Sequence, residues 1–288
     1  MKVVLFCGGL GMRIRDFSEH IPKPMVPIGY RPILWHVMKY YAYYGHTDFI
    51  LCLGFGADAI KNYFLSYNEC LSNDFVLSSG GKKLELLHSD IHDWRITFVD
   101  TGTTANIGQR LKAVEKYLAD EDVFLANYAD GLTDLPLDAQ LSDFQRSGKI
   151  ASFACVRPNL SCHFISVGDN GLVESITDVQ QANLRINGGY FIFRHSILEQ
   201  LNDGEELLHE PFQRLLRAQQ LVAYQYDGFW ACMDTFKDKQ LLDERYARGD
   251  APWELWKGTS QGANGNGIVE SPRPPVERRL APVAIAQQ

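Results

Sequence analysis

The chain has 288 residues, 45% of them hydrophobic and 22% charged, which is enough to build one large globular core or two small ones. The formal net charge of -7 argues against nucleic acid as the main partner, but it does not exclude a nucleotide held by a few local donors and a divalent cation. No apolar run approaches the roughly 20 residues that a membrane span requires, and the first residues carry no signal-peptide cleavage pattern.

The first part of the chain alternates strand and helix patterns. Residues 2–6 are typical of a buried strand that ends in a glycine turn, and apolar side chains from Ile33 to Tyr44 recur at helical spacing, with Gly45 as the natural C-cap. A second buried strand is predicted at 49–53, followed by a helix at about 58–64. This alternation predicts a Rossmann-like, doubly wound α/β sheet.

The rest of the chain contains more β patterns. Two short segments, 84–88 and 95–99, are expected to form a hairpin inserted into the alternation. Further strands are predicted at 123–127, 150–156, 163–167, 172–176, 186–193 and 221–226, and helices at 107–118, 137–146, 196–201, 206–219 and 236–248. We therefore expect a mixed sheet, with a smaller β-rich part in the second half.

The composition changes after Lys257. Residues 258–267 are rich in Gly, Asn and Ser, and residues 271–275 are rich in Pro, so we expect a folded domain over 1–257 and a disordered tail over 258–288. The six cysteines form no Cys-x-x-Cys pair, and their spacing suggests neither zinc ligands nor a disulfide scaffold. A reducing cytoplasm fits these thiols best.

The first chemical signal is a glycine turn directly after the first strand. It reads Gly8-Gly9-Leu10-Gly11-Met12-Arg13, and it is followed by Pro22-Lys23-Pro24-Met25. Backbone N–H groups of such a turn can approach phosphate oxygens closely, and Arg13 and Lys23 offer positive charge to a triphosphate. The glycine spacing matches neither the dinucleotide fingerprint nor the P-loop, so a tight turn beside two surface cations is the alternative. The combination of the two segments favours a phosphate site.

Several further segments complete a family pattern. They are Arg31-Pro32-Ile33-Leu34-Trp35-His36, Trp94-Arg95, Val99-Asp100-Thr101-Gly102, Asp130-Gly131, Ile186-Asn187-Gly188-Gly189, Gly228-Phe229-Trp230 and Met233-Asp234-Thr235. With the glycine turn, they resemble the glucose-1-phosphate cytidylyltransferases, within the wider family of nucleoside-diphosphate-sugar pyrophosphorylases. The resemblance extends from Met1 to about Lys257, and it favours CTP over dTTP, UTP or GTP.

The resemblance implies a nucleotidyl transfer. A phosphate oxygen of the acceptor attacks the α-phosphorus of CTP and pyrophosphate leaves, while Lys23 and Arg13 stabilise the developing negative charge. It also implies Mg²⁺ bound by Asp130 and Asp234, which agrees with the preference of this ion for one or two carboxylates beside phosphate oxygens. A turn aspartate is the alternative for each residue taken alone.

The resemblance also implies where the two substrates bind. It assigns the nucleotide to Asp130 and to residues that precede it in the chain, namely Gly8, Gly9, Leu10, Gly11, Met12, Thr101, Gly102 and Arg110. A helix beginning near Gly108 could point its N–H groups at this ligand, and a helix start with a surface arginine is the alternative. The acceptor is assigned to the smaller β-rich part, at Arg185, Asn187, Gly188 and Gly189.

The acceptor side departs from the family pattern. The family has Glu-Lys-Pro before Ile-Asn-Gly-Gly, and its lysine binds the acceptor phosphate, whereas this chain reads Asp178-Val179-Gln180. The chain has no lysine between Lys149 and Lys237, so Arg157, His163 or Arg185 would have to supply the charge. Departures on the nucleotide side are mild, with Met12 in place of a threonine and Ala129 in place of a glycine. We expect an intact nucleotide half and a rewritten acceptor half.

Two alternatives therefore stay open beside a sugar-1-phosphate cytidylyltransferase. One is a transferase that acts on another phosphorylated metabolite, and the other is a catalytically silent, nucleotide-binding regulatory subunit. The presence of Lys23, Asp130 and Asp234 argues against the silent subunit. The resemblance also implies a homo-oligomer.

Overall fold

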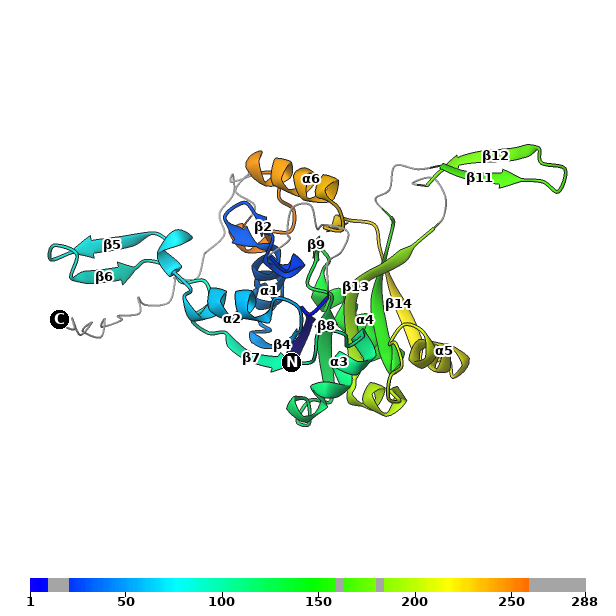
Figure 1. Cartoon of the computed structure of the whole chain (residues 1–288), viewed down its shortest axis with the longest axis horizontal. Coiled ribbons are helices and arrows are strands. Elements are labelled where there is room, and N and C mark those ends of the chain that lie inside the picture. The colour runs from blue at the N-terminus through cyan, green and yellow to red at the C-terminus, as the bar shows by residue number, and fades with distance from the viewer. Residues whose placement is uncertain (10–20, 159–162, 180–183, 259–288) are drawn as a thin grey trace.

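A mixed seven-stranded sheet forms the centre of the protein. The computed structural model describes residues 1–9, 21–158, 163–179 and 184–258 (Figure 1). The strand order is β14-β10-β13-β8-β1-β4-β7. The bounds are β1 (Lys2–Phe6), β4 (Asp48–Leu53), β7 (Arg95–Asp100), β8 (Val123–Asn127), β10 (Ala151–Val156), β13 (Ile186–Arg194) and β14 (Leu221–Tyr226).

One strand reverses the direction of this sheet. The segment β8-β1-β4-β7 is parallel throughout, and β10 is parallel to β14. Between these two parallel groups, β13 runs antiparallel to both β8 and β10. The expected mixed, doubly wound α/β architecture is confirmed.

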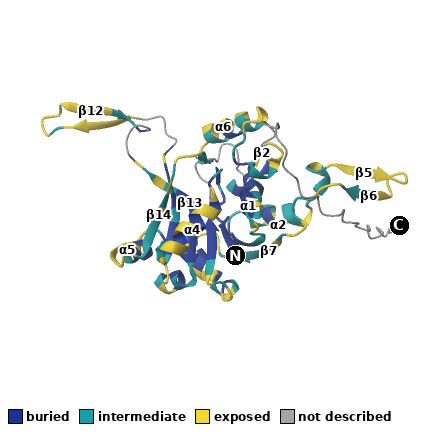
Figure 2. Cartoon of the chain, turned by 180° about the vertical axis from the view of Figure 1, so that it is seen from behind, coloured by how far each residue is buried: buried dark blue, intermediate teal, exposed yellow. Residues whose placement is uncertain are grey.

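Helices cover both faces of the sheet, so its central strands are buried on both sides. Along β1, Val3 and Leu5 belong to one apolar cluster, and Val4 and Phe6 to the other, as the two-residue period of a strand requires. The first cluster includes residues of α1 (Ile33–Tyr43), α2 (Ala57–Leu65), α4 (Leu137–Ser147) and α6 (Phe236–Ala247), and the second includes residues of α3 (Ile107–Ala113) and α5 (Glu210–Arg217). Buried residues concentrate in this central layer (Figure 2).

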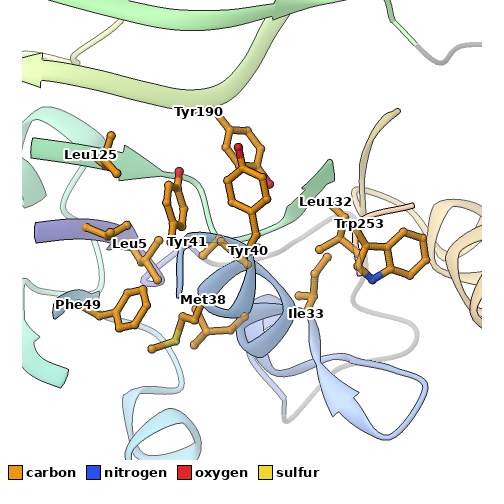
Figure 3. Close-up of a cluster of buried hydrophobic side chains, with 14 of the residues drawn as sticks. Leu5, Ile33, Met38, Tyr40, Tyr41, Phe49, Leu125, Leu132, Tyr190 and Trp253 are labelled. Carbon is orange, nitrogen blue, oxygen red and sulfur yellow. The ribbon is translucent and has the colours of Figure 1, made fainter. Parts of the chain in front are cut away.

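Helix α1 packs against the antiparallel strand β13 through tyrosines. Its Tyr40 and Tyr41 pack against Tyr190 of β13, with ring centroids 5.2 and 6.0 Å apart (Figure 3). The Tyr40 hydroxyl donates to the Leu135 carbonyl at 2.9 Å, so its polar end is satisfied inside the core. The expected helix and its cap are confirmed, because Gly45 follows the helix with φ +81°.

The predicted hairpin of 84–88 with 95–99 is wrong. β6 (Lys83–Leu86) pairs instead with β5 (Phe75–Ser78), a strand that we did not predict. The segment at 95–99 becomes β7, an edge strand of the main sheet parallel to β4. The reason is that the crossover through α2 brings β7 beside β4, although the two strands are far apart in the sequence. Local sequence patterns do not report such long-range pairing.

Three predicted helices are shorter or tighter in the structure. The helix expected over 107–118 ends at Ala113 and is followed by a 3-10 turn, η4 (Glu115–Tyr117). Residues 195–200 form another 3-10 segment, η5 (His195–Gln200). The helix expected over 206–219 begins only at Glu210, because Pro211 lacks an N–H and fits the first turn.

Two hairpins project from the body on opposite sides (Figure 1). One is β5–β6, and the other joins β11 (His163–Val167) to β12 (Val173–Asp178). Among the described residues, no helix is both long and apolar enough to cross a membrane. The predicted disordered tail lies outside the described residues, apart from Gly258.

Candidate active site

A lysine shared by two aspartates lies at the carboxyl edge of the sheet. The Lys23 ammonium donates to Asp130 Oδ2 at 2.7 Å and to Asp234 Oδ1 at 2.6 Å. Lys23 begins a short 3-10 turn, η2 (Lys23–Met25), in which the N–H of Met25 bonds to the Pro22 carbonyl at 2.7 Å. The prolines of this segment restrict its backbone and so help to hold Lys23 in place.

A pair of short strands brings the two aspartates together. β9 (Gly131–Thr133) follows Asp130 directly, and β15 (Trp230–Cys232) precedes Asp234 by one residue. The two strands are antiparallel, with Gly131 opposite Cys232, and the N–H of Met233 donates to the Asp130 carbonyl at 2.9 Å. The structure thus brings together Lys23, Asp130 and Asp234, three of the four residues for which we predicted catalysis or metal binding; the fourth, Arg13, lies outside the described residues.

The electrostatics of this site keep the lysine charged. Burial lowers the pKa of Lys23, but the ion pairs with Asp130 and Asp234 outweigh burial, and the net effect raises the pKa above its usual value. The three side chains carry a formal net charge of -1, and both carboxylates already converge on one cation. Two converging carboxylates fit Mg²⁺, which completes its shell with water and substrate phosphate. Among the described residues there is no larger group of metal ligands.

Arg110 binds the backbone at Gly8, where the glycine turn begins. Its guanidinium donates to the Gly8 carbonyl at 2.9 Å, to the Leu53 carbonyl at 3.1 Å and to the Thr101 hydroxyl at 2.6 Å. These contacts join the carboxyl ends of β1, β4 and β7, and Arg110 is only 2% exposed. A side chain at Gly8 would place its Cβ 2.1 Å from Arg110 Nη1, so any larger residue there would have to displace this hydrogen-bonded guanidinium. Direct contact of Arg110 or Thr101 with a nucleotide stays a prediction.

The N-terminus of α3 already has protein acceptors for two of its N–H groups. The Asn106 side chain accepts from the N–H of Gln109 at 2.8 Å, and Glu206 Oε2 accepts from the N–H of Ile107 at 3.3 Å. Because these N–H groups already have acceptors within the protein, the capping argues against the prediction that α3 directs them at a ligand. Gly9 and Gly102 lie near this edge, whereas Leu10, Gly11, Met12 and Arg13 lie outside the described residues, and their roles stay predictions.

The segment predicted to bind the acceptor lies close to the aspartate pair. The Asn187 amide donates to the Tyr128 hydroxyl at 3.2 Å, and Tyr128 is two residues before Asp130. The Trp230 indole donates to the Gly188 carbonyl at 2.8 Å. Gly189 has φ +77°, and a Cβ there would lie 2.6 Å from the Tyr128 ring. Sequence patterns alone did not single out Tyr128, because its partner is 59 residues away.

The residues considered for the missing lysine lie in different places. Val179 is buried, with 1% of its surface exposed. His163 stands at the base of the β11–β12 hairpin, opposite Asp178. Arg157 and Arg185 both bind Asp227, an acidic residue that sequence reasoning missed; Arg157 Nε donates at 2.8 Å and Arg185 Nη2 donates at 2.9 and 3.1 Å.

The fold, the glycine turn and the aspartate pair define a nucleotidyltransferase. Residues 2–244 match the family model described as nucleotidyl transferase, and the chain belongs to this family. It is similar to the glucose-1-phosphate cytidylyltransferase of Salmonella typhi, with 36% identity over 259 residues that cover 89% of this chain and 100% of that protein. It is also similar to the probable glucose-1-phosphate cytidylyltransferase of Bacillus subtilis (strain 168), with 34% identity over 258 residues, again 89% of this chain and 100% of the relative.

Solved structures share the fold at low sequence identity. The UTP-bound UGPase from Acinetobacter baumannii has a TM-score of 0.63 and 18% identity, covering 89% of this chain and 97% of that one. UDP-glucose pyrophosphorylase in complex with UDP-glucose has a TM-score of 0.61 and 16% identity, covering 86% of this chain and 98% of that one. The resemblance inferred from the motifs is therefore confirmed at the level of family and fold.

Proposed function

We propose that the protein transfers CMP from CTP to a sugar 1-phosphate, with glucose 1-phosphate as the first candidate acceptor, and releases pyrophosphate. The observation that carries this proposal is the Lys23 ammonium held between Asp130 and Asp234 beside the glycine turn. The similarity to glucose-1-phosphate cytidylyltransferases over their whole length supports the choice of both substrates.

The chemistry is a displacement at the α-phosphorus. A bond forms between this phosphorus and an oxygen of the acceptor phosphate, and the bond to the bridging oxygen of pyrophosphate breaks. Because its pKa is raised, Lys23 acts as a fixed positive charge and not as a proton acceptor. Such a preorganised charge stabilises the transition state more than the ground state.

The aspartates would hold the metal of this reaction. We propose Mg²⁺ as the cofactor, with Asp130 and Asp234 as its protein ligands. When bound, the ion neutralises phosphate charge and orients the phosphate for displacement. The contact of Asp234 Oδ2 with the Cys232 thiol, at 3.6 Å, helps to orient the second carboxylate.

The acceptor would lie at the start of β13. Asn187 is oriented there by two bonds, because its amide donates to Tyr128 and its carbonyl oxygen accepts from the N–H of Gly189 at 2.9 Å. Gly188 and Gly189 leave room for a ligand to approach the backbone. On the sequence evidence we also propose a cytoplasmic, homo-oligomeric enzyme; the buried thiols of Cys7 and Cys52 agree with a reducing compartment.

The buried Val179 favours a second candidate, a transferase whose acceptor is not glucose 1-phosphate. One experiment separates the candidates: pyrophosphate release with Mg²⁺, measured for CTP, UTP, ATP and GTP against a panel of phosphorylated sugars. We expect release with CTP and a sugar 1-phosphate. Preference for a purine nucleotide would contradict the proposal, and tight CTP binding with no release for any acceptor would favour the regulatory subunit.

A further inference from the structure

The β5–β6 hairpin has one face that is entirely apolar. Every second residue on each strand is apolar, and the register places these side chains on the same face of the ribbon. The cross-strand pairs of this face are Phe75 with Leu86 and Leu77 with Leu84. Phe75 and Leu77 are 42% and 58% exposed, so water reaches much of this face.

The β11–β12 hairpin has an apolar face of its own. Its cross-strand pairs are Ile165 with Ile176 and Val167 with Val173. These four side chains are between 56% and 65% exposed. Within the described part of the chain, no residue of either hairpin belongs to the two apolar core clusters, so the body covers neither face.

A buried arginine fixes the base of the β5–β6 hairpin to the body. Arg31, which is 2% exposed, donates to the Asn68 carbonyl and to the Tyr63 hydroxyl, both at 3.2 Å. Glu69 closes the base, because its carboxylate accepts from the N–H of Asp90, beyond the second strand, at 2.8 Å. A buried guanidinium is unfavourable without such partners, so this network determines where the hairpin leaves the body.

Two uncovered apolar faces are unfavourable for an isolated chain. A lone two-stranded hairpin is at best marginally stable in water, because it has no second layer on which to bury its apolar side. Contiguous exposed apolar surface is typical of an interaction site. Both ribbons present an apolar face of two cross-strand pairs, so one can form the second layer for the other.

The charges at the two tips favour contact between different hairpins. Lys82 lies in the turn of β5–β6, Asp169 lies in the turn of β11–β12, and both are exposed. Tip-to-tip contact between two copies of one hairpin would bring like charges together, whereas contact between unlike hairpins brings Lys82 towards Asp169. A single chain does not make this contact internally, because its hairpins project on opposite sides of the body (Figure 1).

We propose that the apolar face of β5–β6 in one copy packs against the apolar face of β11–β12 in the next, so that the partner is a second copy of this chain. Because the two hairpins project on opposite sides, the contact is heterologous and repeats around a ring larger than a dimer. This inference specifies a surface for the proposed homo-oligomer, and it does not depend on the proposed reaction.

Single substitutions on either apolar face should separate the copies. Leu77→Lys and Ile165→Lys each place an ammonium in the contact, so the dissociation constant should rise by about 100-fold or more. Light scattering after size-exclusion chromatography should give an assembly larger than a dimer for the unmodified protein and the mass of one chain for both variants. Val76→Lys and Phe164→Lys are matched controls that should retain the assembly, because these residues lie on the opposite faces of the same strands.

Mixing the two variants tests the pairing of unlike hairpins. A copy carrying Leu77→Lys keeps an intact β11–β12 face, and a copy carrying Ile165→Lys keeps an intact β5–β6 face. Their equimolar mixture should therefore form a heterodimer through one contact, although each variant alone is monomeric. If Ile165→Lys alone still dimerises, the β5–β6 hairpin pairs with itself and the proposal is wrong.

Two further results would overturn the proposal. Unchanged mass in both face variants would place the interface elsewhere, without excluding a homo-oligomer. A monomeric unmodified protein at micromolar concentration would refute the contact, and self-association after truncation at Gly258 would then show that the tail covers these faces.

Folding and activity are measured separately from assembly. Far-UV circular dichroism checks that each variant is folded, and Leu84→Lys or Ile176→Lys on the same faces replaces a variant that is not. Pyrophosphate release by the unmodified protein tests the proposed reaction, so a failure of that reaction leaves the result on assembly intact.

Discussion

The Lys23 site and a second ionic cluster, formed by Arg157 and Arg185 with Asp227, lie on one edge of the same sheet but differ in exposure. At the first site two carboxylates share one largely buried ammonium, and at the second two guanidiniums share one exposed carboxylate. Converging carboxylates suit a metal ion that carries phosphate, whereas an exposed ion pair contributes little to stability and is screened by salt. We infer that the half of the edge that holds Lys23 serves the nucleotide and that the half from β13 onward serves the acceptor, and the following predictions test that division.

The largest effect should come from the Lys23 site. Lys23→Ala removes a charge that is needed more in the transition state than in the ground state, so kcat should fall by about 100-fold or more. Steady-state pyrophosphate release measures this, with Lys112→Ala as a control because Lys112 forms an exposed pair with Glu115. A loss in kcat smaller than about threefold would show that Lys23 does not stabilise the transition state.

The aspartates should act together on the metal. Asp130→Asn and Asp234→Asn each remove a carboxylate, so both should shift the Mg²⁺ concentration for half-maximal activity upward, by roughly tenfold or more. The measurement is a magnesium titration at saturating CTP. An unchanged titration in Asp234→Asn would show that this residue is not a metal ligand.

On the acceptor side, a substitution of Val179 tests whether the acceptor pocket differs from that of the family. Because Val179 is buried, Val179→Lys should bury an unpaired ammonium. The free energy of unfolding should fall by about 2 kcal/mol or more, and the melting temperature and the activity should fall with it. Val179→Met controls for side-chain length. If the lysine instead lowers KM for glucose 1-phosphate, the pocket retains the shape of the family and the acceptor half has not been rewritten.

The stability of the folded protein should depend on pH through a buried histidine of the core, which belongs to neither half of the sheet edge. Burial lowers the pKa of His36 to about 4, and its ring bonds the Ile28 carbonyl at 3.0 Å and the Trp253 indole at 3.3 Å. The unfolded histidine, with its ordinary pKa of 6.5, binds a proton first. The free energy of unfolding should therefore fall as pH drops from 6.5 towards 4, by up to about 3 kcal/mol.

Denaturant titrations across this pH range check the effect. His36→Gln should reduce the slope of stability against pH. Part of the slope should remain, because burial also lowers the pKa of His46 to about 4. An unchanged slope in the variant would show that His36 does not stay neutral in the folded protein.

The smallest effect is expected from the tail. Truncation after Gly258 should change neither the melting temperature nor kcat measurably, because the composition of this segment cannot bury enough apolar surface to offset chain entropy. The last described turn, η6 (Leu255–Lys257), remains in the shortened chain. A large loss of activity or stability would show that the tail docks on one of the two halves or on a second subunit.

Local patterns in the sequence predicted most of the elements and one of the two sites. Residues 163–167 and 221–226 were predicted as strands with the observed bounds, because alternation and apolar runs depend on neighbouring residues. β5, β9 and β15 were missed, since β5 has no buried residue and the other two have three residues each. Such strands are identified by their partners and not by their own pattern.

The sequence by itself determined which chemical groups are present: the glycine turn, Lys23, the two aspartates and the loss of a lysine at Val179. Tertiary structure alone decided how they meet, since Lys23 lies 107 residues from Asp130 and 211 from Asp234. It also decided that Arg110 binds the Gly8 carbonyl and that Arg157, Arg185 and Asp227 meet at the carboxyl edge near β13. The physical reason is that periodicity and turn chemistry arise from contacts between near neighbours, whereas charge pairing across a sheet depends on strand order, which crossovers set.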